Sequence, residues 1–149
     1  IVHAATHGHF DSDPKRTFLL TFSEKRNQGR LHMNRLHDIV AITELRDKRP
    51  LELLTLSACQ TAVGDEKAAL GLAGVAFKAG ARSALATLWS VSDKATAKLV
   101  AAFYRHLKNP ALSKAQALQK AQLQLLRSEK PDQEHPYFWA AFLLIGNWL

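Results

Sequence analysis

The chain has 149 residues, of which 47% are hydrophobic and 22% charged, and its formal net charge is +7. This length and composition indicate one folded domain and exclude a disordered chain, and the single cysteine excludes a disulfide scaffold or a cysteine-rich metal cluster. The chain holds neither an apolar run of the ~18 residues that a membrane span needs nor a signal-like start, and its lone thiol suits a reducing compartment, so we expect a cytoplasmic protein.

Short apolar runs alternate with longer stretches of helical periodicity, which is typical of an α/β domain. The first half of the chain predicts a strand over 1–5, a hairpin over 17–33, a helix capped by Asn34 and a buried strand over 51–56. The second half predicts a helix over 68–79 that ends at Gly80, a strand over 81–88, helices that begin at Ser92 and Ser113, and a strand over 140–145. The buried strands favour a parallel sheet covered on both faces.

The helical stretches also predict which side chains face the core. The inward positions are Leu36, Ile39, Val40 and Leu45 in the first helix, Ala95, Leu99, Ala102 and Phe103 in the helix after Ser92, and Leu118, Ala121 and Leu125 in the helix after Ser113.

Basic charge is spread along the chain and forms no block. The first 50 residues hold nine basic and six acidic side chains, and the remaining 99 hold eleven and seven. Proteins that bind nucleic acid usually concentrate their basic residues and carry a recognisable reading motif, and the sequence has neither. The pattern therefore favours an ordinary basic surface, with no membrane partner and with nucleic acid only as a weaker alternative.

Two short motifs follow the carboxyl ends of predicted buried strands. The first contains His7 and Gly8, and the second contains Cys59. If the two strands are parallel neighbours, His7 and Cys59 lie near each other at one edge of the sheet, whereas antiparallel strands would separate them by ~17–20 Å. An imidazole beside a thiol can take its proton or stabilise the thiolate, and the backbone N–H groups of Gly8 and Cys59 can form an oxyanion hole.

Each of these residues also has a purely structural interpretation. Most single cysteines are small buried hydrophobic residues, and a histidine in a turn often bonds only to backbone. His3 alternates with Ile1 and Ala5, which favours a core histidine over a second base. On the residues alone, both interpretations stay open.

Six short motifs occur in a fixed order along nearly the whole chain. They are Ala5-Thr6-His7-Gly8, Leu56-Ser57-Ala58-Cys59-Gln60-Thr61-Ala62, Gly71-Leu72-Ala73, Ala79-Gly80-Ala81-Arg82-Ser83, Leu88-Trp89-Ser90-Val91-Ser92-Asp93 and His135-Pro136-Tyr137-Phe138-Trp139-Ala140-Ala141-Phe142. In this order and rough spacing they resemble CHAT domains, the caspase-like domains that are often attached to tetratricopeptide repeats in bacteria and are related to separase.

The resemblance implies a three-layer α/β/α caspase–haemoglobinase-like fold with a mostly parallel central sheet over residues 1–149, lacking its N-terminal part. It implies a cysteine endopeptidase with His7 as base and Cys59 as nucleophile, acting on a protein or peptide substrate. Upstream tetratricopeptide repeats or a regulatory partner protein are the implied partners. The alternative is a catalytically silent interaction or scaffold domain with the same fold.

Two acidic residues are candidates for the substrate pocket. In the clan that the resemblance implies, loops after the strand that follows the nucleophile shape the pocket for the substrate residue before the scissile bond (P1), so Asp93 is a candidate acid for a basic P1 side chain. Asp65, beside Glu66, is the second candidate. The structural alternatives are a helix-start carboxylate for Asp93 and a solvated loop pair for Asp65 and Glu66. Trp89 and Trp139 are expected to pack on the sheet and its rim, and the alternative is that they line a substrate cleft.

The histidines other than His3 and His7 show no metal-ligand spacing with carboxylates or a thiol, so we assign neither a metal nor a cofactor.

Overall fold

A computed structural model describes residues 1–9, 15–22, 29–47, 50–57, 80–127 and 134–149 of the chain. The helix predicted over 68–79 lies outside these ranges. The candidate site residues Cys59 and Asp65 lie outside them as well.

Among the described residues, the central sheet has four strands in the order β1-β5-β6-β7, which are Val2–Ala4, Leu54–Leu56, Ser83–Thr87 and Phe142–Gly146. β1 pairs with β5 in parallel and β5 with β6 in parallel, whereas β7 runs antiparallel to β6. In the register of the first pair, His3 lies opposite Thr55 and Ala4 opposite Leu56. The parallel pairing of the strands predicted over 1–5 and 51–56 is therefore confirmed, and both end at the same edge of the sheet.

A smaller antiparallel sheet has the order β2-β3-β4, with strands Gly8–His9, Phe18–Leu20 and Arg30–His32 in the part of the chain that the structure describes. β3 and β4 form the hairpin predicted over 17–33. Position 29 of this hairpin requires glycine, because a Cβ atom on Gly29 would lie 2.2 Å from the carbonyl oxygen of Thr21. β2 was not predicted, since two residues give no periodic signal.

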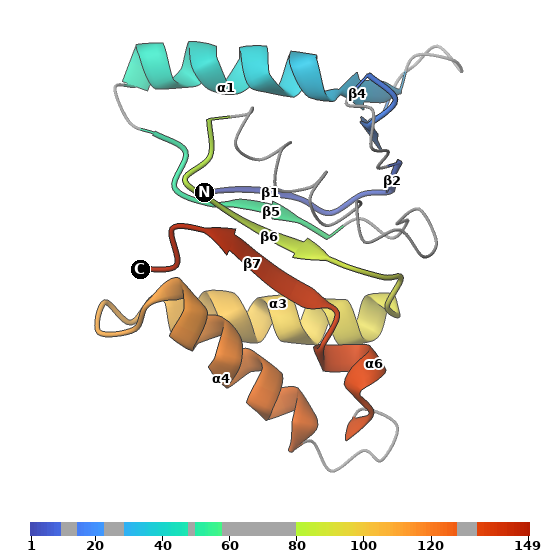
Figure 1. Ribbon diagram of the computed structural model, residues 1–149, viewed down its shortest axis with the longest axis vertical. Coiled ribbons are helices and arrows are strands. Elements are labelled where there is room, and N and C mark those ends of the chain that lie inside the picture. The colour runs from blue at the N-terminus through green and yellow to red at the C-terminus, as the bar shows by residue number, and fades with distance from the viewer. Residues whose placement is uncertain (10–14, 23–28, 48–49, 58–79, 128–133) are drawn as a thin grey trace.

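Helices cover both faces of the central sheet (Figure 1). α1 (Met33–Asp47) lies on one face, and α3 (Asp93–Leu107) and α4 (Lys114–Leu126) lie on the other. A short helix, α6 (Pro136–Trp139), leads into β7. The architecture is the predicted three-layer α/β/α fold around a mostly parallel sheet.

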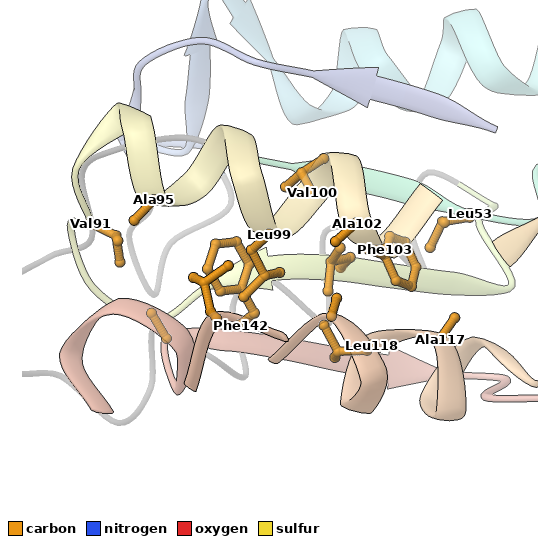
Figure 2. Close-up of a cluster of buried hydrophobic side chains, with 14 residues drawn as sticks. Leu53, Val91, Ala95, Leu99, Val100, Ala102, Phe103, Ala117, Leu118 and Phe142 are labelled. Atoms are coloured by element: carbon orange, nitrogen blue, oxygen red, sulfur yellow. The ribbon is translucent and has the colours of Figure 1, made fainter. Parts of the chain in front are cut away.

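Alternation along the strands divides the apolar side chains between two cores. Leu54 and Leu56 pack with Leu36 and Val40 of α1 on one face. On the opposite face, Leu53 joins the side chains of α3 and α4 in the cluster drawn in Figure 2. The inward positions predicted for these two helices, Ala95, Leu99, Ala102, Phe103, Leu118, Ala121 and Leu125, are all buried.

The predicted starts of α3 and α4 are confirmed, whereas the predicted start of α1 is wrong. Ser92 caps α3, and Ser113 forms a capping box with Gln116 at the start of α4. α1 begins at Met33, directly after β4, so Asn34 lies inside the first turn and is not the predicted cap.

A second correction concerns the buried face of α1. Among the side chains of this helix that the structure describes, Leu36 and Val40 form the buried row that packs on the sheet. Ile39, predicted to share this face, is 48% exposed. The reason is geometric, because Ile39 lies about 80° around the helix axis from the centre of that row.

Candidate active site

A pocket of about 520 Å³ lies at the edge of the central sheet where β1 and β5 end. Ligand sites of open α/β sheets gather at this edge. One wall is the side of α3, with the apolar side chains of Ala97, Val100 and Ala101. The polar side chains that line it come from β1, from the chain after β1 and β5, and from α3; they are His3, Thr6, His7, Ser57, Asp93, Thr96 and Tyr104.

His7 reaches the pocket from the turn between β1 and β2. Its side chain is exposed and lines the pocket. The backbone carbonyl of His7 accepts a hydrogen bond of 2.7 Å from the N–H of Leu20, and the Thr6 hydroxyl donates one of 2.7 Å to the Leu20 carbonyl. These two bonds attach the turn that contains His7 to β3.

Gly8 follows His7 and pairs in register with Leu19 of β3. Because the Leu20 N–H bonds to the His7 carbonyl, Gly8 and Leu19 form a non-hydrogen-bonded pair of the antiparallel ladder. In such a pair the backbone N–H points away from the neighbouring strand. The Gly8 N–H therefore points away from β3, and its oxyanion-hole role stays a prediction.

Ser57 marks the point where the chain leaves β5, two residues before Cys59 in the sequence. Its backbone N–H donates a 3.2 Å hydrogen bond to the carbonyl of Ala4, so the ladder between β1 and β5 extends to this residue. Cys59 and Asp65 lie outside the described residues, and their roles stay predictions. The structure confirms the condition on which the His7–Cys59 pair depends, namely two parallel strands that end at one edge.

Asp93, the first residue of α3, lines the same pocket as His7. Ser92 caps this helix, so the Asp93 carboxylate also lies in the first turn, where it interacts favourably with the helix dipole. The two interpretations predicted for Asp93 are therefore compatible, because the start of α3 is itself part of the pocket wall.

The prediction of a core position for His3 is wrong. Its side chain is exposed and lines the pocket, with Nε2 2.8 Å from Oγ of Ser57. Partial burial lowers the pKa of His3 below its usual value, which favours the neutral ring. β1 forms one end of the described sheet, and its α3-side face meets the pocket and not the core. The parallel pairing of β1 and β5 is the signal that indicates the His3–Ser57 contact, because in that register His3, Thr55 and Ser57 lie on the same face of the sheet.

The two tryptophans pack as predicted, against the core on the α3 side of the sheet. The Trp89 indole N–H donates a 2.9 Å hydrogen bond to the carbonyl of Tyr137, whose ring stacks on it with centroids 6.5 Å apart. The Trp139 indole N–H donates to the carbonyl of Glu134 at 3.0 Å. These bonds satisfy both indoles within the fold.

The comparison with protein families covers nearly the whole chain. A family model described as the CHAT domain matches residues 1–147. The chain belongs to the CHAT domain family. This places it among caspase-like, peptidase-related domains, and the matched region includes His7, Asp93 and Cys59. A search of curated proteins found no match to this CHAT domain.

The described residues of this CHAT domain contain no group of three or more His, Cys, Asp or Glu side chains placed to hold a metal ion. None of the helices within them has both the length and the apolar character to cross a membrane.

Proposed function

We propose that this CHAT domain is a cysteine endopeptidase of the bacterial cytoplasm, in which His7 activates Cys59 to hydrolyse peptide bonds in protein substrates. The observation that supports the proposal is the parallel pairing of β1 and β5. Because of this pairing, the two strands that precede the His7 and Cys59 motifs end at the same edge of the sheet, beside a pocket that His7 lines. Membership of a caspase-like, peptidase-related family supports the same chemistry.

In the proposed reaction, His7 accepts the thiol proton of Cys59, and the sulfur attacks the carbonyl carbon of the substrate. The backbone N–H groups of Gly8 and Cys59 stabilise the oxyanion that forms. The His7 imidazolium then gives its proton to the leaving amine, and a thioester to Cys59 remains. Water, deprotonated by His7, hydrolyses this thioester and restores the thiol.

We further propose that the pocket receives a basic P1 side chain. The apolar wall of α3, with Ala97, Val100 and Ala101, suits the methylene stem of lysine or arginine, and the Asp93 carboxylate suits its charged head. Asp65 is a second candidate acid for the same substrate group. We also propose that upstream tetratricopeptide repeats or a regulatory partner protein control the peptidase activity.

A positional library of fluorogenic tetrapeptides tests this function on the 149-residue chain, with and without the proposed repeats or partner protein. We expect thiol-dependent cleavage with a preference for lysine or arginine at P1. Asp93→Asn should lower kcat/KM for basic P1 substrates roughly ten- to a hundredfold, because a charge-assisted hydrogen bond is lost, and should change cleavage of alanine substrates far less.

The matched control is Asp38→Asn, which removes an exposed carboxylate from α1 on the other face of the sheet and should leave kcat/KM unchanged. An equal loss for basic and alanine substrates in Asp93→Asn would contradict a P1 role and favour its helix-start role alone. Absence of cleavage by every form of the protein would favour the silent interaction domain.

A further inference from the structure

A second histidine lines the pocket, and the proposed reaction does not use it. His3 lies in the middle of β1, opposite Thr55 of β5 in the parallel register. Its Nε2 atom is 2.8 Å from the hydroxyl oxygen of Ser57, which comes two residues after Thr55, just past the end of β5, and on the same side of the sheet. The bond therefore links the two strands whose ends carry the His7 and Cys59 motifs.

The His3 ring also has a neighbour on the helix layer. The Tyr104 ring of α3 lies with its centroid 5.7 Å from that of His3. Its hydroxyl donates a 2.8 Å hydrogen bond to Oγ1 of Thr55, which holds Tyr104 against β5. His3 thus contacts both the chain at the end of β5 and α3.

We propose that His3 is a positioning residue, whose hydrogen bond to Ser57 fixes where the chain leaves β5 and so directs Cys59 toward His7. This inference rests on the proposed function. The backbone bond from Ser57 to Ala4, at 3.2 Å, is a long one, and the side-chain bond adds a second attachment to β1 at the same residue. Cys59 follows Ser57 by two residues, which span at most ~7 Å, so we expect the position of Ser57 to affect that of Cys59.

A substitution at His3 can distinguish a positioning role from the role of a second base. A base must take up a proton during the reaction, whereas a positioning group needs only to keep its hydrogen bond. Glutamine can donate to or accept from the Ser57 hydroxyl, and it cannot act as a base at neutral pH. His3→Gln should therefore preserve a positioning role and abolish a basic one.

The alkylation rate of the single cysteine, Cys59, at pH 7 measures its activation directly, with iodoacetamide as the probe. We expect His3→Ala and Ser57→Ala each to slow alkylation roughly three- to tenfold, the effect of one lost hydrogen bond. The double variant should be no slower than the slower single one, because both remove the same bond. His3→Gln should restore the wild-type rate. His37→Gln, on α1 across the sheet, is the matched control and should have no effect.

Circular dichroism and thermal unfolding of each variant separate this effect from loss of fold. Equal alkylation in the wild-type chain and in His7→Ala would overturn the proposed function, and this inference with it. Slower alkylation in His7→Ala but a wild-type rate in His3→Ala would overturn the positioning role alone. A His3→Gln chain as slow as His3→Ala, or additive effects in the double variant, would also overturn it.

Discussion

Cys59→Ala is expected to abolish proteolysis while the domain keeps its fold. The substitution removes the sulfur that attacks the peptide carbonyl, and the remaining groups can only bind and polarise the substrate. We expect kcat/KM to fall by at least ~10³-fold. The change of side-chain volume is small, so far-UV circular dichroism and the unfolding midpoint should stay close to those of the wild type.

Cys59→Ser is the matched control, because it keeps a side chain of similar size but replaces the thiol with a hydroxyl, which remains protonated at neutral pH. It should also lose most activity. Cleavage by Cys59→Ala at the wild-type rate would assign the hydrolysis to another group or to a contaminating peptidase, and the proposed role of Cys59 would then be wrong.

Phe103→Ala is expected to lower the free energy of unfolding by about 3–5 kcal/mol, which is the usual cost of truncating a fully buried aromatic side chain. Phe103 is 0% exposed and lies in the cluster between the sheet, α3 and α4 shown in Figure 2. The variant loses the transfer free energy of the ring and leaves a cavity between layers that cannot collapse fully. Urea unfolding followed by tryptophan fluorescence measures the difference.

The control for this prediction is Phe22→Ala, since Phe22 is 93% exposed and buries almost none of its ring in the described structure. Its free energy of unfolding should stay within ~0.5 kcal/mol of the wild type. If the two variants lose the same free energy, the cluster on the α3 face is not the principal core of the domain.

The long elements of the fold were predictable from the sequence because several local signals agree on each of them. In α3, the Ser92 cap and an apolar row ending in Phe103 indicate the same helix, and the structure confirms it. β2 and α6 have two and four residues, too few for a period to be seen. The direction of β7 was also not predictable from the sequence, because its continuous apolar run has the pattern of a buried parallel strand, whereas β7 pairs antiparallel with β6.

The candidate site was predictable only where it depends on motifs at strand ends. His7 follows directly from such a position, whereas Asp93 was predicted from the resemblance to CHAT domains; both line the pocket. The pocket position of His3 was not predicted, because its contact with Ser57 joins residues 54 positions apart and depends on the register of two strands. Alternation shows which residues share a face of one strand, but it does not show whether a pocket or the core covers that face.

The pH dependence of Cys59 alkylation tests the His7–Cys59 pair most directly. In the wild-type chain, the rate should reach half of its maximum at a pH below ~8.5, the value of an unperturbed thiol, because the imidazolium form of a neighbouring His7 favours the thiolate. In His7→Ala the midpoint should rise to that value, and in urea both chains should behave alike. Identical midpoints near ~8.5 in the folded wild-type and His7→Ala chains would contradict the catalytic pair.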